Sequence, residues 1–301
     1  MKLVIIGNGF DLNHGYDTSY HSYKKFLCSK KTQYTVGTFS IVDIFEMADE
    51  NLWNDFENAL GDYPFDEWGN TYTSNINWDD DKQSDRDISY NSSLDDSFRE
   101  ICNQLPSAIC QSLSDFVTSQ TKMNTPKIPL FQNYVNNDNY FITFNYTDTL
   151  EKIYGIKQEK ICHIHGKAYY TPYEHDYYTY HSPEIIFGHG NTDAKFNNEL
   201  DEYDFGNPHK KLGNLVALFK KNYQLETLKE CLKNKCFDEI VIIGHGLGSV
   251  DMPYFNKLNE LQTSQINSIT YFNWDKNTNN EKKKLLNIIF PRKKINILNY
   301  N

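Results

Sequence analysis

The sequence predicts an α/β protein in which helices cover both faces of a mostly parallel sheet. Short, unbroken aliphatic runs alternate with helical patterns, which is the order typical of parallel sheets. The runs lack the polar–apolar alternation of half-exposed strands, so both faces of the sheet should be buried. Seven runs are expected to be strands, over residues 3–6, 140–144, 160–164, 184–187, 239–243, 269–272 and 295–298. Between them, helices are expected over residues 210–221, 224–233, 253–262 and 279–289.

The first predicted strand, Leu3–Ile6, leads directly into Gly7-Asn8-Gly9. Two glycines at a strand end allow a ligand phosphate to approach the backbone, because no Cβ stands in the way. The residue three positions beyond Gly9 is Leu12, so the full dinucleotide fingerprint G-x-G-x-x-G is absent. A phosphate loop and an ordinary tight turn are both open interpretations of this segment.

A mainly helical insertion is predicted over residues 35–135, within a single domain of residues 1–301. Apolar residues recur at three- and four-residue spacing from Leu94 to Phe116, which indicates an amphipathic helix that Pro106 should kink or split. Residues 62–92 are expected to form an acidic loop, either a lid over a site or simply a mobile segment, because eight acidic and two basic residues lie between positions 62 and 87.

The segment WNDFE, residues 53–57, allows two interpretations. Trp53 and Phe56 stand at the i, i+3 spacing of one helix face, so core packing is the first. Entry of Glu57 into a site from the insertion is the second.

Composition argues against several classes of protein. The formal net charge of −10 disfavours a nucleic-acid binder, which normally carries a basic stripe. The six cysteines include no C-x-x-C pair and the nine histidines no H-E-x-x-H, so no metal site is expected. No run approaches the ~20 apolar residues that a membrane span needs, and scattered cysteines suit a reducing compartment. We expect a cytoplasmic protein with no membrane partner, and the composition disfavours a nucleic-acid partner.

Polar residues follow several of the predicted strands. Asn145, His165 and His189 each come after a strand, as does Gly244-His245-Gly246. The carboxyl ends of parallel strands meet at one edge of a sheet, where ligands of such sheets bind. Each residue also has a structural explanation, since asparagine is common in turns and a lone histidine is more often a satisfied structural group.

Six segments together resemble the AbiH family of bacteriophage abortive-infection proteins. They lie in the expected order between residue 5 and about residue 275, and they read GNGFDLNHG, WNDFE, FNYTDTLE, HIHG, FGHGN and GHGLGSVD. Several of them also resemble segments of sirtuin-like NAD hydrolase domains, so the resemblance implies a Rossmann-like, sirtuin-like sheet. The zinc-binding cysteines of sirtuins are missing, as are the Pro and Arg after the glycine turn, which argues against protein deacetylation. The acid of the sirtuin-like N-Y-D segment comes one residue later here, at Asp148.

The resemblance implies an antiphage abortive-infection effector that hydrolyses the nicotinamide–ribose bond of NAD, with no further cofactor. In that role His165 acts as the base on a ribose hydroxyl or on water, and Asn145 binds the ribose and positions that water. Asp11 either faces the cationic ribosyl centre or is simply a residue at a helix N-terminus. The remaining contacts implied for NAD come from two groups of residues. Gly7, Asn8 and Gly9 are implied to bind the diphosphate. Gly244, Ser249 and Asn273 are implied to bind the adenosine half.

Two other functions stay open at this point. The first is a nucleotide-binding sensor that cleaves nothing, and the second is a hydrolase or nuclease acting on another nucleotide or on nucleic acid. A homo-oligomer and a phage-derived trigger are both compatible with these roles.

Overall fold

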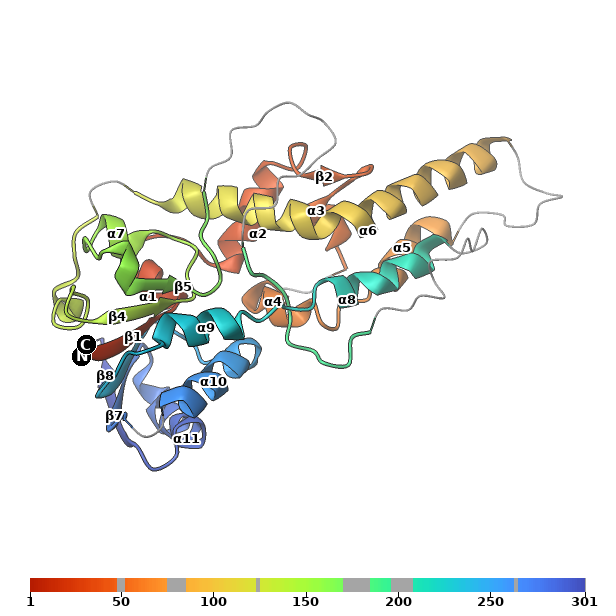
Figure 1. Cartoon of the computed structure of the whole chain (residues 1–301). Coiled ribbons are helices and arrows are strands. Elements are labelled where there is room, and N and C mark those ends of the chain that lie inside the picture. The colour runs from red at the N-terminus through yellow and green to blue at the C-terminus, as the bar shows by residue number, and fades with distance from the viewer. Residues whose placement is uncertain are drawn as a thin grey trace.

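The computed structural model describes residues 1–47, 52–74, 85–122, 125–169, 185–195, 208–262 and 265–300. A six-stranded sheet forms its centre, with strand order β5-β4-β1-β6-β7-β8 and only parallel pairings (Figure 1). The strands are β1 (Lys2–Ile6), β4 (Tyr140–Thr143), β5 (Ile161–His163), β6 (Glu239–Ile243), β7 (Ser268–Asn273) and β8 (Lys294–Asn299). The chain winds outward from β1 in one direction and then returns to its other side, which is the strand order of Rossmann sheets. The predicted fold class is confirmed.

The sheet is buried on both faces, as the unbroken apolar runs predict. Leu3 and Ile5 pack with α9 (Leu225–Leu232), α10 (Met252–Gln262) and α11 (Asn279–Ile289). Val4 and Ile6 point to the other face, which α1 (Asn8–Asn13) and α7 (Thr149–Lys152) cover. Consecutive β1 residues thus belong to separate cores, because side chains alternate across a strand.

Six of the seven predicted strands are confirmed, and the strand over residues 184–187 is wrong. Residue 184 lies outside the described part, and Ile185 forms only an isolated antiparallel bridge with Gly166. The run is apolar because Phe187 packs on the core of the insertion and not because it belongs to the sheet.

Three of the four helices expected after the insertion are confirmed, as α9, α10 and α11. The helix over residues 210–221 is broken into a 3-10 helix, η5 (Pro208–Asn214), and one turn of α-helix, α8 (Leu215–Leu218). The chain is then extended, and Lys220 bridges to His189.

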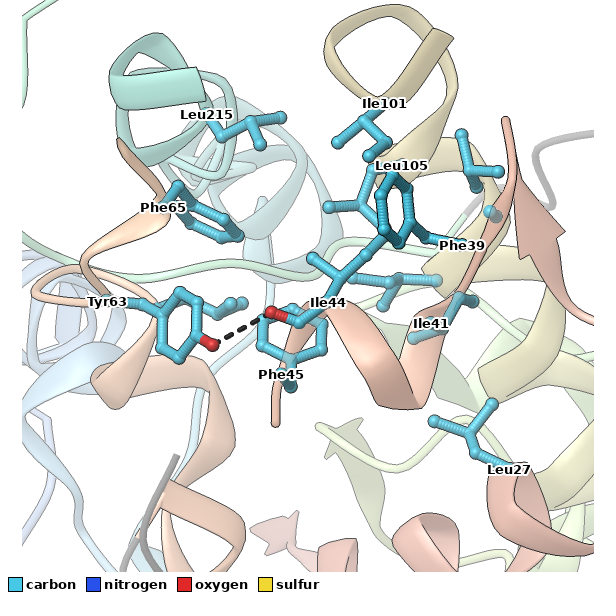
Figure 2. Close-up of a cluster of buried hydrophobic side chains, with 14 of the residues drawn as sticks. Leu27, Phe39, Ile41, Ile44, Phe45, Tyr63, Phe65, Ile101, Leu105 and Leu215 are labelled. Atoms are coloured by element: carbon cyan, nitrogen blue, oxygen red, sulfur yellow. Dashed lines mark hydrogen bonds between the residues drawn. The ribbon is translucent and has the colours of Figure 1, made fainter. Parts of the chain in front are cut away.

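A long helical insertion separates β1 from β4 and packs around a core distinct from those of the sheet, to which η5 and α8 also contribute. Its elements are α2 (Tyr20–Ser29), β2 (Thr35–Val36), β3 (Phe39–Ser40), α3 (Ile41–Ile44), η1 (Leu52–Asn54), α4 (Phe56–Ala59), α5 (Phe65–Thr73), α6 (Asp85–Gln120) and η2 (Pro129–Phe131). Figure 2 shows part of this core, where the Tyr63 hydroxyl donates to the Ile44 carbonyl at 2.8 Å.

Two expectations for the insertion need correction. Helix α6 continues through Pro106, so the alternative that the proline splits it is wrong, and the nearby Leu105 and Ala108 are fully buried in the core. The acidic loop over residues 62–92 is in part helical, since Phe65–Thr73 form α5 and residues 85–92 belong to α6. Phe65 and Trp68 anchor α5 in the core, while its acidic residues occupy the first turn, where the helix dipole favours them. Residues 75–84 lie outside the described part of the chain.

Candidate functional site

A cavity of about 220 Å³ lies at the carboxyl ends of β1, β4, β5 and β6, under the helical insertion. Ligands of open α/β sheets bind where the winding direction reverses, and here that point lies between β1 and β6. The polar wall residues of the cavity that follow the strands are Asn8, Asp11, Asn145, Tyr146, Thr147, His165, His245 and Asp251. The insertion adds Thr18, Tyr20, Asp55 and Glu57.

The glycines after β1 and β6 let two loops pack backbone against backbone. The Gly9 N–H donates to the Gly244 carbonyl at 2.8 Å. Gly244 has φ +71°, and a Cβ there would lie 2.1 Å from the Phe10 nitrogen. A Cβ on Gly7 would lie 2.5 Å from His245 Cα. Gly7 and Gly244 line the cavity, whereas Gly9 does not, and its amide already has a partner.

Asp11, in α1, is a buried carboxyl on the cavity wall. Thr147 and Thr149 each donate a hydroxyl hydrogen bond of 2.7 Å to it. Burial raises the pKa of Asp11 to about 6, although these hydroxyls and the Asn145 amide oppose the rise. A carboxyl with this pKa exchanges protons close to neutral pH, as a general base or acid must.

Because its pKa is raised, the ionised form of Asp11 lowers the free energy of unfolding, and the variant Asp11→Asn tests this. Between about pH 4 and 6 the folded chain binds more protons than the unfolded chain, so the contribution of Asp11 to the free energy of unfolding falls as pH rises through that window. The rise of the Asp11 pKa from 3.8 to about 6 lowers the free energy of unfolding by about 3 kcal/mol at pH 7. We expect Asp11→Asn to melt at a higher temperature than the wild type at pH 7, with a gap that narrows toward pH 4. Thermal melts at both pH values measure it, and a variant that melts lower at pH 7 would contradict the assignment.

Two histidines face the two oxygens of one aspartate. His245 Nε2 lies 3.2 Å from Asp251 Oδ2, and His165 Nε2 lies 3.3 Å from Asp251 Oδ1. His245 Nδ1 accepts the Leu247 N–H at 3.0 Å, so the neutral ring carries its proton on Nε2, toward Asp251. His165 Nε2 is buried and makes no aligned hydrogen bond with any described residue.

Burial and the nearby Lys221 charge lower the pKa of His165 below its usual value, against the opposing effect of Asp251. The imidazole is therefore neutral at neutral pH and can accept a proton. For Asp251, burial would raise the pKa, but the two nearby histidines and the charge of Lys221 hold it well below the usual range. The site thus pairs a proton acceptor with a permanently ionised carboxylate.

A buried ammonium joins the insertion to the strand ends. Lys221 Nζ lies 2.7 Å from Glu57 Oε2 and 3.1 Å from Asp251 Oδ1, and its side chain is 1% exposed. Burial alone would lower the pKa of Lys221, but the two carboxylates raise it above its usual value. Tyr20 donates to the other Glu57 oxygen at 2.6 Å. Glu57 thus enters the site, as the second interpretation of WNDFE had it, while Trp53 and Phe56 pack in the core of the insertion.

Asn145 ties the β4 end to the glycine turn. Its amide donates to the Gly7 carbonyl at 3.1 Å. Its buried Oδ1 has no hydrogen-bond partner among the described residues. An unsatisfied buried acceptor is costly unless a ligand or water donates to it.

Besides Gly9, three residues singled out in the sequence lie outside the cavity wall. Ser249 is exposed at the start of η6 (Ser249–Asp251). Asn273 donates its amide to the Asp275 carbonyl and to Asn279 Oδ1, both at 2.7 Å, and so holds the loop after β7. His189 is structural, since its ring contacts the Val216 carbonyl at 2.6 Å and accepts the Asn191 N–H at 3.0 Å.

Neither a metal cluster nor a membrane helix stands out in the part of the chain that is described. No three His, Cys, Asp or Glu side chains there are arranged to hold a metal ion. None of the described helices is both long and apolar enough to cross a bilayer.

The fold and the site define an α/β protein with a Rossmann strand order and a cavity, lined in part by acidic side chains and histidines, at the switch point of its sheet. Residues 3–273 match the family model for bacteriophage abortive infection AbiH. The chain therefore belongs to the AbiH family, which implies a role in phage abortive infection. No match was found among curated proteins or solved structures, and the sirtuin-like character of the sheet stays a prediction.

Proposed function

We propose that this AbiH protein hydrolyses the bond between nicotinamide and ribose in NAD. The charge of the cavity supports the proposal most strongly. The carboxyl groups of Asp11, Asp55, Glu57 and Asp251 all line it. Among the described residues no lysine or arginine lines the cavity. The ammonium of Lys221 contacts the Glu57 carboxylate but is not part of the cavity wall. Such a cavity favours a cation, and the nicotinamide ring of NAD and the ribosyl centre left by its departure are both cationic.

The size of the cavity limits what can enter it. Pockets that hold a whole ligand usually enclose ~300–1,000 Å³, and this one encloses about 220 Å³. It therefore suits the nicotinamide riboside end of NAD, with the rest of the dinucleotide outside.

The chemistry needs no acid for the leaving group. The C1′–N bond breaks with its electron pair going to the ring nitrogen, so nicotinamide leaves neutral. The Asp251 and Glu57 carboxylates stabilise the ribosyl cation, as preorganised charges do for charge that develops in a transition state. Water then bonds to C1′ and gives its proton to His165, and the products are nicotinamide, ADP-ribose and a proton.

The unpartnered Asn145 Oδ1 suits a ribose hydroxyl, which would donate the missing hydrogen bond. The pKa of Asp11, about 6, is close enough to neutral pH for this carboxylate to accept a proton as His165 does. In an infected cell, hydrolysis at this site would deplete NAD and stop growth before phage multiply.

The test of His165 compares two alanine variants. His165→Ala should lower nicotinamide release from NAD by roughly 100-fold or more, the usual contribution of a positioned base. His21→Ala removes an exposed histidine of α2, outside the cavity wall, and should keep wild-type activity. Chromatography of nicotinamide after incubation with NAD measures both.

Equal activity in His165→Ala and the wild type would contradict the role of His165. Saturable binding of NAD by the wild type with no nicotinamide, even after long incubation, would favour the non-catalytic sensor.

A further inference from the structure

We propose that a second cavity beside the first binds the diphosphate of the same ligand, an inference that rests on the proposed function. This outer cavity encloses about 370 Å³ between α6, α7 and the segments after β4 and β5. The two cavities share Val117, Tyr146 and Thr147 in their walls. In NAD the diphosphate is joined directly to the nicotinamide ribose, so a site for it must adjoin the inner cavity.

The two cavities differ in charge. Four carboxyl groups line the inner cavity, and they would repel a diphosphate. Lys152 and Lys167 line the outer cavity, and Asp148 is the single carboxylate among its described wall residues. NAD has a cationic nicotinamide ring and an anionic diphosphate. The ring matches the acidic inner cavity, and the diphosphate matches the outer cavity with its two lysines.

The lysines can turn to a ligand at little cost. Lys152 Nζ lies 2.9 Å from Asp148, and its side chain is 68% exposed. Lys167 Nζ lies 2.8 Å from Glu151 Oε1, and its side chain is 41% exposed. Only the lysine side of each pair is exposed, since the Asp148 and Glu151 side chains are 21% and 20% exposed. The ammonium groups can still reach phosphate oxygens, which accept charge-assisted hydrogen bonds as carboxylates do. Glu151 would keep a partner, because His163 Nε2 lies 3.0 Å from the same oxygen.

The glycine turn after β1 is a poorer place for the diphosphate. The Gly9 amide is already bonded to the Gly244 carbonyl, and Asn8 and Gly7 border the cavity that the carboxylates line. The diphosphate expected there from the sequence therefore fits better beside Lys152 and Lys167.

Titration calorimetry with ADP, which carries the diphosphate but no nicotinamide, tests the subsite. We expect ADP to bind the wild type, more weakly at high salt. The double variant Lys152→Ala/Lys167→Ala should bind at least tenfold more weakly, since two charge-assisted hydrogen bonds are lost. Lys152→Arg/Lys167→Arg keeps both charges and should keep most of the affinity.

The control is Lys229→Ala/Lys233→Ala, in α9 and directly after it, which removes two exposed, ion-paired lysines outside both cavities. It should bind ADP as the wild type does. Unchanged ADP affinity in Lys152→Ala/Lys167→Ala, or no ADP binding by the wild type, would overturn the subsite. ADP binding does not depend on hydrolysis, so a weakened double variant in a protein that releases no nicotinamide would contradict the proposed function alone.

Discussion

Asp251→Asn should lower nicotinamide release from NAD by roughly 100- to 1,000-fold, the usual cost of removing one preorganised electrostatic contact. Asparagine keeps the shape of the side chain but removes the charge that we propose faces the ribosyl cation. The carboxylate also contacts His165, His245 and Lys221, at 3.3, 3.2 and 3.1 Å. Because the pKa of Asp251 lies well below its usual range, the wild type keeps this charge at every working pH.

Asp193→Asn is the matched control, since Asp193 is exposed and lies outside the cavity wall. It should release nicotinamide at the wild-type rate. Initial rates at saturating NAD compare the three proteins, and circular dichroism shows whether each is folded. A folded Asp251→Asn variant with the wild-type rate would contradict the role of the carboxylate.

Lys221→Met should destabilise the fold by about 3–5 kcal/mol, the usual cost of breaking a buried ion pair by removing one partner. Methionine fills the space of the lysine stem but leaves Glu57 and Asp251 buried without their shared cation. At roughly 2–4 °C per kcal/mol for a chain of about this size, the melting temperature should fall by about 10 °C. The pKa of Lys221 is raised above 10.5, so its contribution is fully present at neutral pH and is lost only in strong base.

The neighbouring Lys220 is exposed and provides the control. Lys220→Met should melt close to the wild type, because it removes a surface charge and one exposed hydrogen bond, from Lys220 Nζ to the Thr192 carbonyl at 3.2 Å. Adding Glu57→Gln to Lys221→Met should recover part of the loss, since one uncompensated carboxylate disappears. Calorimetric melts of the four proteins at pH 7 measure this, and equal melting temperatures for Lys221→Met and Lys220→Met would contradict a structural role of the buried ammonium.

Much of the sheet and part of the site could be predicted from local patterns. The unbroken aliphatic runs of β1 and β6 indicated strands buried on both faces, and they are. Asp11, Asn145 and His165 meet in one cavity because the ends of parallel strands share an edge of the sheet.

The charged centre of the site could not be predicted in the same way. Two adjacent lysines, Lys220 and Lys221, are typical of a solvent-exposed segment. The partner of Lys221, Glu57, is 164 residues away in the sequence. Asp251 ends the motif GHGLGSVD, but only the turn η6 directs it back toward His165 and His245. Long-range packing of the insertion on the strand ends, and not a local pattern, creates this network.

Mass spectrometry of a nucleotide mixture incubated with the purified wild type and with Asp251→Asn tests the central claim most directly. The wild type should consume NAD and form nicotinamide and ADP-ribose in equal amounts, and Asp251→Asn should leave NAD intact. Intact NAD with the wild type, or its cleavage at the diphosphate into two mononucleotides, would contradict the claim that this cavity hydrolyses the nicotinamide–ribose bond.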